Sequence, residues 1–279
     1  FIGGMQELTA FGNVRSLRSY YERREHSVEI DGLLDAVDKL WECITLCRAR
    51  QIPQRMEQFN QALERAEVCS DPLMRALLPA FRKKFGKRLT TPGLIKWCVQ
   101  SDMLQQALTV YKERIPIYIM SERDDILNAV PNAPKPNMQK DYVSEEEARF
   151  YEHFLKMGRN MRKAYYGMEV DTYNGDQKDY TVTTLEHLEE LMPHSFFVTK
   201  YSIERLRTIV MDYLYIRAIR NMTNHANDQE NDSQKQLMEY LNQDPAYKRL
   251  NELKAEDIRH TILTALEHLQ PLPKKERVK

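Results

Sequence analysis

The sequence predicts an all-α protein, and three observations support this prediction. Glycine is rare, with nine residues in 279, whereas average proteins contain about 7%. Runs that alternate between polar and apolar residues, as half-buried strands do, are scarce. Apolar residues instead recur at steps of three and four through most of the chain, which is the period of an amphipathic helix. With 42% apolar residues, the chain can bury a core, which excludes disorder throughout.

The most regular helical pattern spans residues 28–50. Its apolar stripe consists of Ile30, Leu33, Leu34, Val37, Leu40, Trp41, Ile44 and Cys47. Pro53 is expected to close this helix, because proline breaks a helix interior. The other helices are expected over residues 54–68, 73–85, 94–99, 103–115, 144–165, 185–192, 202–221 and 255–269.

Several of these boundaries carry capping signals. Asp71 followed by Pro72 predicts the start of a helix, because aspartate accepts hydrogen bonds from the free N–H groups there and proline suits the first helical position. Gly86 is expected to end the same helix. Ser144, which three glutamates follow, predicts a capping box. Pro116 is expected to kink or end the helix that contains it.

Polar, turn-forming segments separate the helices. Residues 131–140 contain three prolines and predict a loop. Residues 168–184 predict a mobile insertion, and residues 224–237 form the most polar stretch of the chain. The basic tail at residues 273–279 is expected to be disordered.

Composition excludes several functional classes. The 41 basic and 41 acidic residues balance, so a nucleic-acid partner would need basic groups that are gathered locally or assembled across two subunits. No apolar run approaches the roughly 20 residues of a membrane span, and the N-terminus lacks a signal-peptide pattern. We therefore expect a cytoplasmic protein without membrane contact. The four cysteines have no C-x-x-C spacing and are expected to be buried, reduced thiols.

Arg220, Asn221 and His225 are the candidate catalytic residues. They lie where the long amphipathic helix predicted over residues 202–221 is followed by the polar stretch. A neutral imidazole can take a proton from a ribose 2′-hydroxyl or return one to the leaving 5′-oxygen. A guanidinium stabilises charge on the phosphate oxygens in the transition state, and the asparagine amide can orient either group. Because the 2′-hydroxyl is itself the nucleophile, this cleavage of RNA needs no metal and no other cofactor.

Helical geometry limits how these residues act together. Five residues turn a helix by about 500°, which leaves Arg220 and His225 about 140° apart. They can cooperate where the helix ends or kinks, or where two copies meet about a two-fold axis and share one cleft. Arg217, one turn earlier, is a candidate for phosphate binding or for a salt bridge. The alternative for the motif is a surface salt bridge of Arg220 beside a solvent-exposed His225.

This motif resembles the R-N-x-x-x-H motif of HEPN ribonucleases. Residues 107–116, with the sequence ALTVYKERIP, resemble the ALTLxxExxP helix upstream of that motif in the CRISPR-associated CARF-HEPN ribonucleases of type III systems. The opening of the chain is similar to the exit from their CARF domain into the first HEPN helices.

The resemblance implies a HEPN-type helical bundle over residues 21–272, with additional helices and long polar loop insertions, and a linker or sensor-domain remnant over residues 1–20. It implies single-stranded RNA as the substrate and a homodimer in which both subunits contribute Arg220, Asn221 and His225 to one cleft. The implied role is that of an effector in type III CRISPR antiviral defence. No strand-rich CARF region is visible, so a cyclic oligoadenylate activator is expected only at a domain absent from this chain.

Two alternatives stay open. The helices can serve only for dimerisation or protein docking, without catalysis. The chain can also be a HEPN toxin that an antitoxin neutralises, which has the same chemistry in a different pathway. The first residue is a phenylalanine instead of a methionine, from which we expect a fragment of a longer protein.

Overall fold

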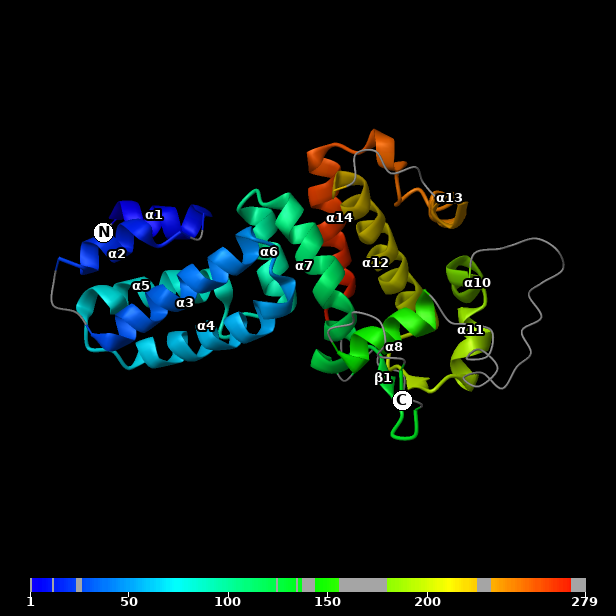
Figure 1. The fold of residues 1–279 in the computed structure, drawn as a ribbon, viewed down its shortest axis with the longest axis horizontal. Helices are drawn as coiled ribbons and strands as arrows, with labels where there is room; N and C mark the ends of the chain where they lie inside the picture. Colours follow the sequence, from blue (N-terminus) through cyan, green and yellow to red (C-terminus); the bar gives the residue numbers. More distant parts are fainter. Residues whose placement is uncertain are drawn as a thin grey trace. The chain divides into compact units, whose positions relative to one another are not determined.

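The part of the chain that the computed structural model describes is all-α (Figure 1), which confirms the predicted fold class. The described residues are 2–11, 13–23, 27–123, 125–133, 135–136, 144–155, 180–224 and 232–271. Among them, β1 (Asn128–Ala129) and β2 (Phe197–Val198) form a short antiparallel ladder. The sequence does not predict this ladder, because two residues per strand are too few to show an alternating pattern.

The chain divides into two compact units, with unit 1 ending at Val110 and unit 2 beginning at Tyr111. The boundary falls within α7 (Leu104–Ile117). The division into a linker or remnant over residues 1–20 and one domain over residues 21–272 stays a prediction. An unbroken helical pattern carries no signal of a unit boundary, so the sequence places none there.

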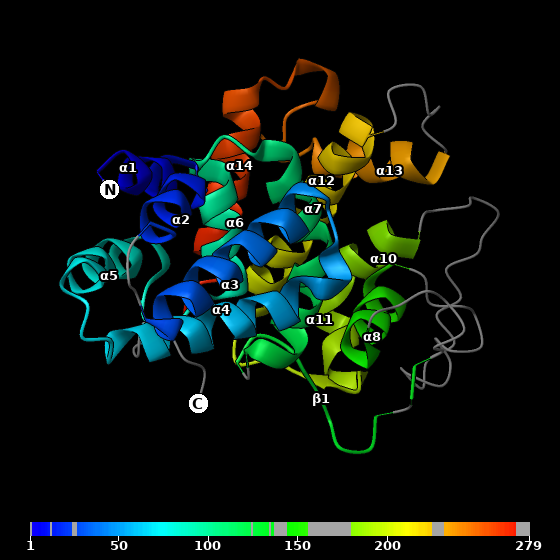
Figure 2. The same cartoon turned by 60° about the vertical axis from the view of Figure 1, so that its left-hand side comes forward.

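Unit 1 is built from helices in its described part. The helices that precede α7 are α1 (Ile2–Phe11), α2 (Arg15–Tyr21), α3 (Val28–Thr45), α4 (Ile52–Glu67), α5 (Pro72–Phe85) and α6 (Thr91–Gln100). α3 and α4 lie side by side as an antiparallel pair (Figures 1 and 2). α1 packs against α2 and α5. Leu8, Leu17 and Tyr21 are buried, so the first two helices contribute to the core of this unit.

The connection between α3 and α4 differs from the prediction. α3 ends at Thr45, five residues earlier than expected, and a short 3₁₀ turn, η1 (Ala49–Gln51), follows. Pro53 does not close α3 but lies in the first turn of α4, where its missing N–H leaves no helical hydrogen bond unmade. Cys47 lies in the connection with a φ of 50° and is exposed. The expectation of buried thiols is therefore wrong for Cys47, although the other three cysteines are buried.

The predicted caps at Asp71 and Gly86 are present, and at Ser144 the structure shows the N-cap bond of the predicted capping box. The Asp71 side chain accepts a hydrogen bond from the Met74 N–H at 2.7 Å, at the start of α5. Gly86 ends α5 with a φ of 73°, in the left-handed region that favours glycine. Ser144 accepts from the Glu147 N–H at 3.2 Å, at the start of α8 (Glu145–Phe154).

Pro116 does not end α7, which continues through it to Ile117 and then widens into a π-helical turn, η2 (Tyr118–Glu122). Proline removes one backbone hydrogen bond and crowds the preceding turn. Ile115 and Ile119 on either side of it are fully buried. Tertiary packing of these side chains therefore holds the helix together where the local sequence favours an end.

Unit 2 is organised around a long, deeply buried helix. After α8, its elements are α10 (Tyr180–Glu186), α11 (Leu188–Leu191), η3 (Met192–His194), α12 (Ile203–Asn224), α13 (Asp232–Leu241), η4 (Leu250–Glu252) and α14 (Ala255–His268). α12 packs against α11, α13 and α14. Its buried side chains point in several directions, as in a helix at the centre of a core. They are Leu206, Ile209, Val210, Asp212, Tyr213, Leu214, Tyr215, Ile216, Ala218 and Ile219.

Two segments that the sequence predicts to be polar connections contain helix. α10 begins at Tyr180, inside the insertion predicted over residues 168–184, and α13 takes up the end of the polar stretch 224–237. Val182 and Leu241 are buried, so each short helix places an apolar residue in the core. Asn224 is the last residue of α12. Residues 168–179, residues 225–231 and the basic tail lie outside the described residues.

Candidate functional site

Arg220 and Asn221 lie side by side on the last turn of α12, which ends at Asn224. The Arg220 Nη1 atom donates to the Asn221 Oδ1 atom over 3.5 Å. Both side chains are half-buried. Their neighbours Ile216 and Ile219 are fully buried, so the apolar side of the helix sets the direction in which the two polar side chains point.

His225 lies outside the described residues. The structure therefore brings together two of the three predicted catalytic residues and does not place the third. α12 continues to Asn224, three residues further than the sequence predicts. His225 follows this helix end directly in the sequence.

Arg217 lies one turn before this pair and on the same side of α12. At about 100° per residue, positions 217, 220, 221 and 224 fall within one face of the helix. The Arg217 guanidinium carbon is 5.7 Å from the ring centroid of Tyr151 on α8, which is cation–π distance. Its Nε atom is buried and has no hydrogen-bond partner among the described residues. Among the described residues, Arg217 therefore contacts an aromatic ring and does not form the salt bridge that the sequence predicts as one of its two possible roles.

A pair of tyrosines supports the same face of α12. The Tyr213 hydroxyl lies 2.9 Å from the Tyr151 hydroxyl and donates to the Lys112 carbonyl oxygen at 3.2 Å. The two contacts connect α12 with α8 and α7. Burial raises the pKa of Tyr213 well above its ordinary value, so this hydroxyl keeps its proton as a donor. Arg217 therefore rests against a ring that is itself fixed by a hydrogen bond.

A buried carboxylate in the middle of α12, that of Asp212, forms hydrogen bonds to residues outside this helix. Asp212 accepts a hydrogen bond from the Tyr247 hydroxyl at 3.0 Å, and its other oxygen is 2.7 Å from His268 Nδ1 at the end of α14. Burial raises the pKa of Asp212, while both hydrogen bonds oppose that rise. Arg205 on α12 also donates to the His268 carbonyl oxygen, at 3.1 Å. α12 and α14 are thus held together by both side-chain and main-chain contacts.

We expect the stability of unit 2 to fall as the pH rises above neutrality. The hydrogen bond to Asp212 is the main cause that raises the pKa of His268 above its ordinary value of about 6.5, while burial and Arg205 act against it. A raised pKa in the folded state gives stability that is complete below about pH 6.5 and is lost as the pH passes through the raised value.

Urea unfolding followed by far-UV circular dichroism from about pH 6 to pH 9 measures this effect. His268→Gln, which keeps a hydrogen-bond donor but does not titrate, is the control and should flatten the profile. An identical pH profile for the wild type and His268→Gln would contradict the prediction.

Sequence reasoning does not find the residues that position α12. Asp212 and His268 are 56 residues apart, and Tyr151 and Tyr213 are 62 apart. No local spacing in the sequence connects the members of either pair. The one local signal is Asp212 itself, because an aspartate among the buried apolar residues of a helix needs a hydrogen-bonding partner.

The described residues contain no group of three or more His, Cys, Asp or Glu side chains placed to hold a metal ion. Within the same part of the chain, no helix is both long and apolar enough to cross a membrane.

Comparison of the chain with models of known protein families, with curated proteins and with solved structures finds no match.

Proposed function

We propose that this protein is a metal-independent endoribonuclease that cleaves single-stranded RNA, with Arg220, Asn221 and His225 as its catalytic residues. The observation that carries the proposal is the pairing of the Arg220 and Asn221 side chains on the last turn of α12. Arg217 adds a second guanidinium on the same face, one turn away. Arginine side chains commonly contact the phosphate oxygens of a nucleic acid, and both guanidinium groups are candidates for that role.

In the proposed reaction, the ribose 2′-oxygen attacks the adjacent phosphorus while the neutral His225 imidazole accepts the 2′-hydroxyl proton. The bond from phosphorus to the 5′-oxygen breaks, and that oxygen takes up a proton from an imidazolium or from water. Arg220 stabilises the charge on the non-bridging oxygens in the transition state. Asn221, which already accepts from Arg220, orients the guanidinium. The products carry a 2′,3′-cyclic phosphate and a 5′-hydroxyl.

The proposal includes a homodimer in which each subunit contributes its Arg220, Asn221 and His225 to one cleft, as the HEPN resemblance implies. It also includes a cytoplasmic role as an effector of type III CRISPR defence. In that role, a cyclic oligoadenylate acts at a domain outside this chain. The zero formal net charge is compatible with this arrangement, because one guanidinium from each subunit supplies the cationic site locally.

Cleavage of labelled single-stranded RNA in excess EDTA tests this function. We expect the same rate with and without the chelator, and products that end in a 2′,3′-cyclic phosphate. An RNA with deoxyribose at the cleavage position is the control and should stay intact, because it lacks the nucleophile. Activity that EDTA abolishes and Mg²⁺ restores would contradict the mechanism. Absence of cleavage under both conditions would count against catalysis by this chain on its own.

A further inference from the structure

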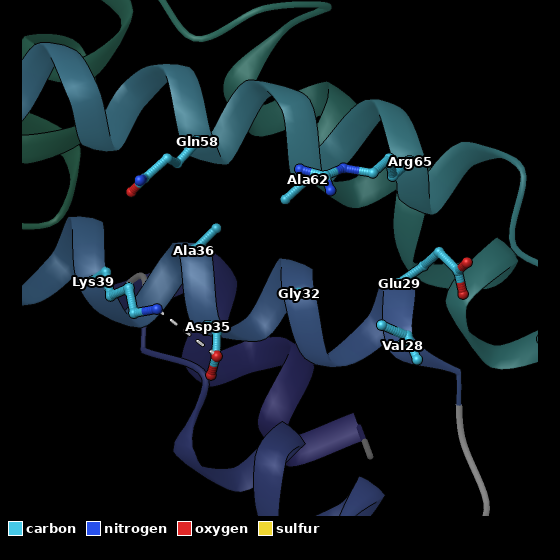
Figure 3. Close-up of a pocket in the computed structure, with 9 residues that line it drawn as sticks. All are labelled: Val28, Glu29, Gly32, Asp35, Ala36, Lys39, Gln58, Ala62 and Arg65. Carbon is cyan, nitrogen blue, oxygen red and sulfur yellow. Dashed lines mark ion pairs between the residues drawn. The ribbon is translucent and has the colours of Figure 1, made fainter.

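A groove in unit 1 is lined by residues of both α3 and α4 (Figure 3). Its volume is about 400 Å³, and its floor consists of the small residues Gly32, Ala36 and Ala62. At one end lies Val28, which is 83% exposed. The polar side chains at its rim are Glu29, Asp35, Lys39, Gln58 and Arg65. None of these rim side chains is fully buried, so the groove lacks the buried polar group that would orient a small ligand.

Gly32 has no evident use within a single copy of the chain. It lies inside α3, and a Cβ built on it would meet nothing within 4 Å. Glycine in a helix interior lowers helix stability relative to alanine. A glycine at such a position is useful where another backbone comes close, because it removes the side chain that would hold the two helices apart. The groove is therefore suited to the close approach of another helix backbone.

The groove face of α3 is complementary to itself. Residue 34 is the midpoint of residues 29–39 of α3. Glu29 and Lys39 are each five residues from this midpoint, and Gly32 and Ala36 are each two residues from it. An antiparallel copy of α3 that crosses at this midpoint places Glu29 opposite Lys39 of the partner subunit, twice over. It also places Gly32 opposite Ala36 of the partner subunit, so that only small residues meet at the centre.

We propose that this groove binds the same groove of a second copy of the chain, with the two α3 helices antiparallel. Among the described residues of a single copy, the ion pair of Lys39 is with Asp35, at 4.0 Å, and both side chains are more than half exposed. Asp35 is also paired with Arg18 at 2.7 Å. Lys39 can therefore turn to Glu29 of the partner subunit without leaving Asp35 unpaired. This proposal concerns unit 1 and does not rest on RNA cleavage.

Charge reversal tests the pairing by sedimentation equilibrium of the whole chain. We expect the wild type to self-associate through this face of α3, separately from the contact at the α12 cleft in the proposed function, and Glu29→Lys or Lys39→Glu each to weaken that self-association at least tenfold. The double variant Glu29→Lys with Lys39→Glu should regain most of the lost affinity, because the pairs re-form with their signs exchanged. Glu64→Lys on the exposed side of α4 changes the same charge outside the groove and should have little effect. A wild type that stays monomeric, or a double variant no better than the singles, would overturn the proposal.

Gly32→Leu tests the close approach independently of charge. The space around Gly32 is open in a single copy, so the variant should fold normally. Its urea midpoint, which Trp fluorescence reports for unit 1, should be no lower than that of the wild type, because leucine favours a helix interior more than glycine does. The leucine side chain would hold the two α3 helices apart, and we expect at least a tenfold weaker dimer. A Gly32→Leu dimer as strong as that of the wild type would show that the helices do not meet at this face.

Discussion

Replacing His225 by alanine is expected to lower the rate of RNA cleavage on the order of a thousandfold, because a positioned general base or acid contributes about a hundred- to ten-thousandfold. Arg220→Ala should cost about a hundred- to a thousandfold, since it removes the charge that stabilises the phosphate oxygens in the transition state. Arg220→Lys keeps the charge but loses the two-pronged guanidinium contact. Its rate should lie between those of the wild type and Arg220→Ala. Single-turnover assays in EDTA measure these rates.

His260→Ala is the matched control for His225→Ala, because it removes an exposed histidine on α14. It should leave the rate unchanged. Arg217→Ala is expected to weaken RNA binding more than it slows the chemical step, since Arg217 lies a turn away from the proposed reacting group. Unchanged cleavage by His225→Ala, with the fold intact, would reject the proposed mechanism.

Replacing Asp212 by alanine is expected to lower the free energy of unfolding of unit 2 by about 2–4 kcal/mol. The carboxylate is buried and bonded to both Tyr247 and His268. Its removal leaves the Tyr247 hydroxyl, which is in a buried contact, without its acceptor. Asp212→Asn retains a hydrogen-bond acceptor for Tyr247 and removes the buried charge. It should therefore lower the free energy of unfolding by less than Asp212→Ala does.

The measurement can separate the two units. Both tryptophans, Trp41 and Trp97, belong to unit 1, so Trp fluorescence follows that unit while circular dichroism follows both. Asp212→Ala should move the urea midpoint of the dichroism signal and leave the Trp midpoint in place. Glu256→Gln, which removes the charge from an exposed ion pair with Arg259 on α14, is the control and should change little. Equal midpoints for Asp212→Ala and the wild type would show that the buried network does not stabilise α12.

Much of the fold can be predicted because its signals are local. The apolar stripe from Ile30 to Ile44 identifies α3, and the caps at Asp71 and Gly86 bound α5 within a residue. A side chain that caps a helix acts on an N–H group three residues away, and an apolar stripe depends on neighbours one turn apart. The same local pattern places Arg220 and Asn221 at the end of a long helix, where the structure has them.

The sequence by itself therefore determines the all-α class, most helices and the location of the candidate residues on α12. The tertiary structure alone decides which faces meet. Packing carries α7 through Pro116 against the local preference of proline, and it joins Asp212 to His268 across 56 residues. It also brings the Tyr151 ring under Arg217 and the small residues of α3 and α4 into one groove. Such contacts depend on the mutual placement of whole helices, which no short stretch of sequence encodes.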